Sequence, residues 1–206
     1  LQQFGFVHDT EVGKSGFITA LYIVFVPIIS LFLGRRGSPL LWAAVALSLV
    51  GLWFLCIPPE GFTIAAGDLF VLACAVVFSL HILVIGRYVL LVDAVELSMM
   101  QFFCGSILAF FAMLGLGSPA SFGWQPALPA MLWAGIMSNG IAYTLQIVGQ
   151  RGMNDTTSSL ILSLESVFSV ISGWLILNEV LSMREGLGCV LMAAAVVLAQ
   201  LPGNKR

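Results

Sequence analysis

Charged side chains are scarce in this chain: Asp, Glu, Lys and Arg make up 9% of the residues, whereas hydrophobic residues make up 60%. A soluble domain ordinarily carries about 25% charged residues. So few charges exclude an ordinary soluble domain and predict an all-α membrane protein that crosses the lipid bilayer several times. The formal net charge is −2 and no basic patch is present, so nucleic acid is not an expected partner.

Motifs for catalysis, metal binding and nucleotide binding are also missing. The four cysteines lie far apart in apolar runs, without the spacing of zinc ligands. Gly13-Lys14-Ser15 lacks the earlier glycine of a phosphate-binding loop, because His8 occupies that position. We therefore expect no cofactor, no metal and no enzymatic activity. Uphill transport by such a chain would need an ion or exchange gradient rather than ATP.

Seven apolar stretches are long enough to cross the membrane as helices, which takes roughly 20 residues. They cover approximately residues 16–34, 40–57, 66–86, 96–117, 127–148, 156–177 and 185–201. The basic residues are divided unevenly between the two ends of these spans. Lys14 and Arg184 lie on one side, and the other side holds Arg35, Arg36, Arg87, Arg151, Lys205 and Arg206. Since cytoplasmic loops are enriched in Lys and Arg, we expect the C-terminus to be cytoplasmic in a protein of the cell inner or plasma membrane.

An internal repeat is visible when the stretch from Leu1 is aligned without gaps to the stretch from Leu145. Both begin with Leu-Gln-x-x-Gly, and further identities follow along the first and sixth spans. Copies that lie five spans apart must cross the membrane in opposite senses, so the alignment predicts an inverted repeat, as in many secondary transporters. The period also predicts three further spans before Leu1, in a ten-span protein of which this chain is a part. No signal peptide is visible at Leu1.

Two motifs carry a resemblance to a known family. The first is Gly13-Lys14-Ser15-Gly16-Phe17, followed by Leu21-Tyr22 and Pro27. The second runs from Ser163-Leu164-Glu165-Ser166-Val167-Phe168 to Leu177-Asn178-Glu179. They resemble the EamA domain proteins of the drug/metabolite transporter superfamily, which have ten spans in two inverted five-span repeats.

The resemblance has consequences for domain organisation and for one helix. It implies that residues 1–57 are the C-terminal part of a first repeat and that residues 66–202 form the second. The chain departs from the family pattern at Ser166, where a proline is usual, and at Asn178, where a glycine is usual. Losing the proline favours a straighter sixth span.

Glu165 is the most informative residue of the sixth span, because it lies close to the middle of a long apolar run. A carboxylate there costs roughly 2.5 to 3.5 kcal/mol, so we expect it to face protein or a water-filled cavity. On a continuous helix it shares a face about 60° wide with three serines. These are Ser158, Ser169 and Ser172.

Polar stripes on two other spans complete the candidate substrate pathway. The fifth span carries Asn139, Tyr143 and Gln146, and the first carries Thr19 and Tyr22. In the first span, Pro27 removes a backbone hydrogen bond and predicts a kink. Such polar faces serve equally well as contacts between helices. Glu165 differs, because close helix packing needs no carboxylate.

Three functions remain open on these residues. A secondary transporter, exporting or exchanging small organic metabolites by alternating access with a coupling ion, would use the stripes as a pathway. A non-transporting assembly or scaffold subunit would turn them, and small-residue faces such as Cys189 with Ala193, toward partners or a second copy in a homodimer. A membrane-embedded enzyme would need an ionisable cluster, and His8, Asp9 and Glu11 form the only one, on a connecting loop.

Overall fold

The structure is a computed structural model that describes residues 2–8, 12–35, 37–57, 65–115, 124–176 and 182–201. Within these ranges the chain is helical and contains no strand, as the all-α prediction requires. The chain divides into two units, one made of Leu1–Leu83 with Asn154–Arg206 and the other of Val84–Met153.

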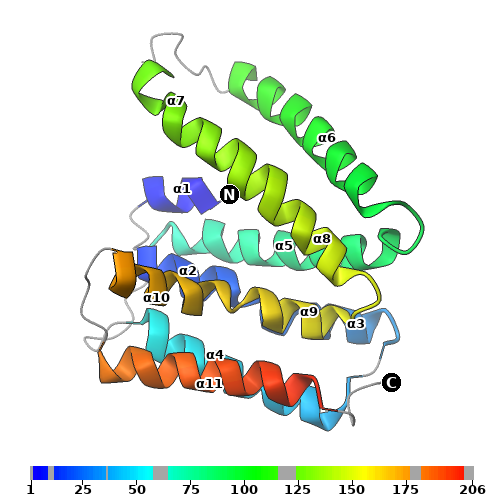
Figure 1. Cartoon of the computed structure of the whole chain (residues 1–206), viewed down its shortest axis with the longest axis vertical. Helices are drawn as coiled ribbons and strands as arrows, with labels where there is room; N and C mark the ends of the chain where they lie inside the picture. Colours follow the sequence, from blue (N-terminus) through cyan, green and yellow to red (C-terminus); the bar gives the residue numbers. More distant parts are fainter. Residues whose placement is uncertain are drawn as a thin grey trace. The chain divides into compact units, whose positions relative to one another are not determined.

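The first unit holds most of the helices (Figure 1). They are α1 (Gln2–Val7), α2 (Val12–Ala20), α3 (Tyr22–Phe32), α4 (Pro39–Cys56), most of α5 (Asp68–Tyr88), α9 (Asp155–Leu162), α10 (Glu165–Ile176) and α11 (Met183–Ala199). The second unit contains the end of α5, then α6 (Ala94–Gly115), α7 (Trp124–Trp133), the π-helix η1 (Ala134–Tyr143) and α8 (Thr144–Gln150).

Five helical stretches of the described chain are long and apolar enough to cross a membrane. They are Lys14–Phe32, Pro39–Cys56, Asp68–Tyr88, Ala94–Gly115 and Asp155–Ile176. The last predicted span corresponds to α11, which has 17 residues. The fifth predicted span is not one α-helix, because η1 separates α7 from α8. Seven spans and an inverted repeat therefore stay predictions.

Two of the membrane-length stretches are interrupted near their middle. The first breaks at Leu21, between α2 and α3, where the Leu21 N–H bonds the Ile18 carbonyl at 3.2 Å in a tighter turn. The other breaks between α9 and α10. The repeat alignment pairs Leu21 with Glu165, the first residue of α10, so the two breaks occupy nearly the same place in both copies. Pro27 lies inside α3, and a kink at Pro27 itself stays a prediction.

Serine side chains account for the second break. The Ser163 hydroxyl donates to the Leu160 carbonyl at 2.7 Å, and the Leu164 N–H bonds the Ile161 carbonyl at 3.1 Å. Serine hydroxyls that bond the preceding turn of a helix compete with its backbone bonds and bend it. Without proline at Ser166, the span still contains a turn before Glu165, and a straighter sixth span stays a prediction.

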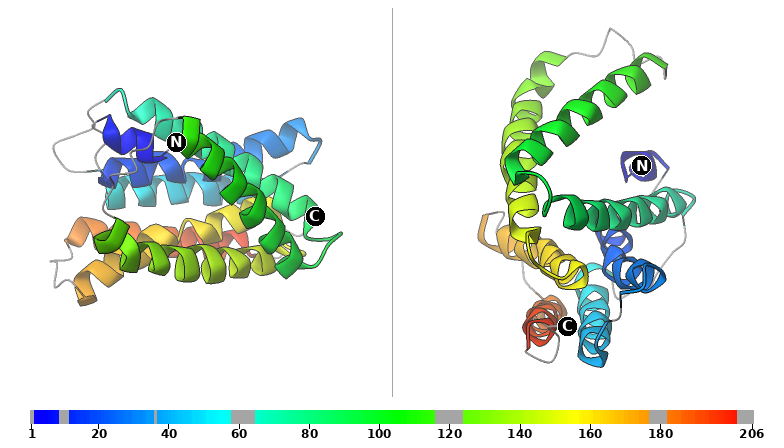
Figure 2. Two further views of the ribbon diagram at one scale, coloured as in Figure 1. Left: turned by 90° about the horizontal axis from the view of Figure 1, so that it is seen from above. Right: turned by 90° about the vertical axis from the view of Figure 1, so that its right-hand side faces the viewer.

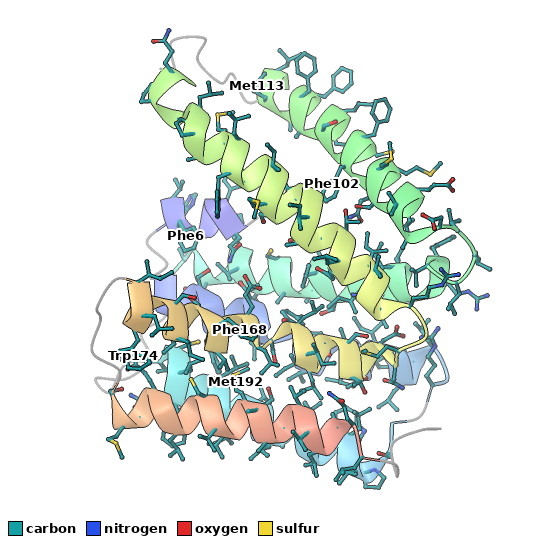
Figure 3. The ribbon with its side chains drawn as sticks, viewed as in Figure 1. Phe6, Phe102, Met113, Phe168, Trp174 and Met192 are labelled. Carbon is teal, nitrogen blue, oxygen red and sulfur yellow. The ribbon has the colours of Figure 1, made fainter. Side chains whose placement is uncertain are left out.

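The first unit is held together by the packing of α4 on α11, which lie side by side in Figures 1 and 2. A side-chain carbon added at Gly188 would meet the Gly51 carbonyl oxygen at 2.8 Å, so the two backbones are in near contact. Met192, fully buried and labelled in Figure 3, packs beside this crossing. Small residues permit such an approach. The sequence pointed to Cys189 and Ala193 as a small-residue face of α11. The face of this helix that meets α4 contains Gly188 instead, since Ala193 is exposed.

Replacing Gly188 by alanine should destabilise the protein, because the two atoms nearest to the added methyl group are backbone atoms of Gly51 and Leu55. Overpacking of this kind costs about 1 to 3 kcal/mol. We expect the thermal midpoint in detergent to fall by about 3 °C or more.

Gly186→Ala is the matched control, being the same change on the same helix with nothing within 4 Å of the added carbon. Its midpoint should stay level or rise, because alanine favours helix. Equal midpoints for the two variants would contradict the close crossing.

Candidate functional site

A cavity of about 320 Å³ lies between the two interrupted spans of the first unit, at the level of their breaks. This volume is at the lower end of the range for small-molecule sites, which is about 300 to 1,000 Å³. The walls come from α1, α2, the start of α3, the end of α4, and the break before α10 with the first turns of α10. We call it the midspan cavity; its lining residues are Gln2, Phe6, Gly16, Thr19, Ala20, Tyr22, Leu55, Cys56, Ser163, Glu165, Ser166, Ser169 and Val170.

Glu165 is the first residue of α10 and lines this cavity. The residue is exposed, and its carboxylate makes no hydrogen bond or ion pair within the described residues. An acidic side chain in the first turn of a helix gains about 0.3 to 1 kcal/mol from the helix dipole. That gain offsets only part of the roughly 2.5 to 3.5 kcal/mol cost of a charge at midspan. The remaining cost makes the carboxylate ready to bind a partner.

Uncharged polar groups converge on the same cavity from four helices. The Gln2 side-chain amide of α1 donates to the Thr19 hydroxyl of α2 at 3.3 Å. Ser166 of α10 and Cys56 at the end of α4 line the cavity as well. Ser169 lies one helical turn beyond Glu165, on the same side of α10. The cavity therefore offers amide, hydroxyl and thiol groups around one carboxylate.

Tyr22 lines the cavity although its residue is only 4% exposed. Its ring packs edge-to-face against Phe78 of α5 with centroids 5.1 Å apart, and Phe78 stacks on His81 at 5.8 Å. Aromatic pairs in these arrangements favour a fixed geometry. We infer that this wall of the cavity is rigid.

Away from the cavity, the end of α3 and the start of α9 pack against each other. Gly34, with φ of 79°, ends α3 in a turn in which the Arg35 N–H bonds the Ser30 carbonyl at 2.9 Å. This turn places the Arg35 guanidinium on the Asp155 carboxylate at the start of α9. Asp155 to Leu160 of α9 are all buried. The α3–α9 end is thus packed and tied by an ion pair.

Four of the predicted pathway residues meet at the midspan cavity: Glu165, Ser169, Thr19 and Tyr22. Two others on the sixth span do not line it. Ser158 is buried in α9, and Ser172 is exposed on α10. Their separation follows from the break, since a face calculated for one continuous helix does not continue across a turn.

The stripe predicted on the fifth span lies in the second unit. Asn139 and Tyr143 belong to η1 and Gln146 to α8, so the stripe does not follow one α-helix. Tyr143 packs edge-to-face against Phe102 of α6, with ring centroids 6.1 Å apart (Figure 3). Asn139 is exposed, and the Gln146 side-chain nitrogen is buried without a hydrogen-bond partner in the described chain.

Some cavity residues were not singled out from the sequence. Gln2 carried a signal, since it aligns with Gln146 in the repeat. Cys56 carried none beyond its place at the end of one span, and Ser166 was noted only as a departure from the family's usual proline. Of the loop cluster, Asp9 and Glu11 lie outside the described residues, while His8 Nδ1 lies 2.8 Å from the Phe4 carbonyl. No metal-holding group of His, Cys, Asp and Glu occurs in the described ranges.

Comparison with known proteins places the chain among transporters by sequence. An uncharacterized transporter of Archaeoglobus fulgidus is 30% identical over 199 residues, covering 93% of this chain and 61% of that protein. This chain thus spans about three fifths of that curated relative. A solved crystal structure, 21% identical, superposes with a TM-score of 0.78 over 96% of this chain and 71% of its own chain, which shows a shared fold.

A family profile identifies the family: the EamA-like transporter family is matched over residues 65–201. Together with the apolar helices, this match shows an integral membrane protein. It also confirms the resemblance drawn from the sequence motifs. The chain belongs to the EamA-like transporter family.

Proposed function

We propose that this protein is a secondary transporter, an exporter or exchanger that moves small organic metabolites across the cell membrane by alternating access. The observation that carries the proposal is the midspan cavity, with a carboxylate, at the break of a membrane-length helix, that has no partner among the described residues. Family membership and the transporter-named relative support a membrane transporter rather than an enzyme. A scaffold subunit would need no such cavity.

Interrupted helices support a transport role, because they are costly in a membrane unless they serve a site. Backbone groups freed by a break must be satisfied by protein or by a water-filled cavity. Discontinuous helices near the bilayer midplane characteristically form the substrate and ion sites of secondary transporters. Here both breaks border one cavity. An ion or exchange gradient would drive any uphill movement.

The two ends of the interrupted pair differ in a way that alternating access explains. At one end α3 and α9 are packed and joined by Arg35 and Asp155. At the other end the cavity lies beside α2 and α10, and α10 exposes Phe168 and Trp174 (Figure 3). We propose that this is one state of the cycle, closed at the Arg35 end. The excess of basic residues there makes this the cytoplasmic end.

Replacing Glu165 by glutamine should abolish most transport while keeping the side chain's shape. The loss of a charge-assisted contact costs about 1.5 to 3 kcal/mol, so we expect the initial rate of solute flux in proteoliposomes to fall by about tenfold or more. Ser172→Ala, on the same helix but outside the cavity lining, should leave the rate unchanged. The proposal fails if the full-length protein moves no solute from a broad metabolite panel.

Breaking the Arg35–Asp155 pair should open the closed end and expose Ser158. Asp155→Asn is the milder way to break it, because the Arg35 side chain is already 50% exposed and can be hydrated. With the native cysteines replaced, Ser158→Cys should resist a hydrophilic thiol reagent when the pair is intact. We expect Asp155→Asn to raise its labelling rate by about tenfold.

Two controls separate gating from general loosening. Reversing both charges, with Arg35→Asp and Asp155→Arg together, should restore protection of position 158. Ser48→Cys, at a fully buried site of α4, should stay unlabelled in every variant. Equal labelling of position 158 with and without the ion pair would contradict the proposed gate.

A further inference from the structure

The charge balance of the midspan cavity restricts what it can bind. Glu165 is the one charged side chain in its lining, and no Lys or Arg of the described residues lines it. An anionic solute would therefore meet a carboxylate with no counter-charge beside it. Like charges brought together in a partly desolvated site are strongly disfavoured.

The three basic side chains that the structure describes in the first unit are already engaged elsewhere. Lys14 Nζ lies 3.1 Å from an Asp68 carboxylate oxygen, and both side chains are largely buried. Arg35 is paired with Asp155 at the closed end. The Arg184 guanidinium carbon lies 5.8 Å from the centroid of the Phe54 ring. None of these described groups is free to receive a solute carboxylate without breaking its present contact.

The remaining lining suits an ammonium group. A primary ammonium has three N–H donors, and around Glu165 the hydroxyls of Ser163, Ser166 and Ser169 supply acceptors on one stretch of chain. Phe6 and Tyr22 supply aromatic surface, which attracts cations. The start of α10, a place where a solute carboxylate could otherwise bind, carries the Glu165 carboxylate itself.

The volume limits the rest of the solute. At roughly 30 Å³ for each water-sized group, a cavity of about 320 Å³ holds on the order of ten non-hydrogen atoms. We propose that the transported solute is a small organic monocation, with one ammonium group bound at Glu165 and no carboxylate. This inference rests on the proposed transport function and names the charge class of its substrate.

Four probes that share a phenyl ring with one benzylic carbon test the charge class: benzylamine (cation), phenylglycine (zwitterion), phenylacetate (anion) and benzyl alcohol (neutral). Binding is measured by isothermal titration calorimetry on the full-length protein in detergent. We expect benzylamine to bind at least about tenfold more tightly than each of the other three. Glu165→Gln should weaken benzylamine binding by about tenfold, and Ser172→Ala should not change it.

Equal or tighter binding of phenylacetate, phenylglycine or benzyl alcohol overturns the inference, as does a failure of the wild-type protein to bind benzylamine. The comparison of the four probes in the wild-type protein does not depend on any variant folding. Flux of the same probes into proteoliposomes separates this inference from the proposed function. If the anion or the neutral probe moves in preference to the cation, the charge class is rejected and the transport proposal is retained. If binding is selective for the cation but no probe moves, the transport proposal is rejected.

Discussion

The need to satisfy every backbone polar group inside a bilayer is the constraint on which this structure depends. A continuous helix meets that need by itself, but a helix interrupted at half its depth does not. Both interrupted spans of the first unit turn their breaks toward the same cavity, where side chains such as Gln2, Thr19 and Ser163 are available. At both breaks tighter turns keep the backbone bonded, since the N–H groups of Leu21 and Leu164 bond carbonyls three residues earlier.

Rigid packing on either side lets this arrangement exist. The crossing of α4 and α11 at Gly51 and Gly188 is backbone against backbone, which fixes the distance between the helices more firmly than flexible side chains could. The hydrophobic cluster that contains Ile23, Val26 and Leu52 joins α3 to this pair.

Much of this could be predicted from the sequence, and the failures have physical causes. Hydropathy places helices well because the bilayer imposes a length on them, so α4, α5 and α6 begin and end close to the predicted limits. The energetic cost of a carboxylate at midspan predicted that Glu165 faces protein or a cavity, and it lines one. What the sequence does not reveal is where a helix turns tightly: a face calculated at 100° per residue linked Ser158 to Ser172, and the turn at Ser163 separates them. Cys56 could not be recognised, because its neighbours in the cavity come from distant parts of the chain.

The packing of α4 on α11 has a consequence for biosynthesis. The glycine face of α4 is made early, whereas its partner is the last described helix to be synthesised, and the whole second unit is inserted between them. Contacts between residues so far apart in the chain form late and slowly. Until α11 is synthesised, the surface of α4 around Gly51 has no helix packed against it. The incomplete first unit is then accessible to chaperones, proteases and incorrect partners.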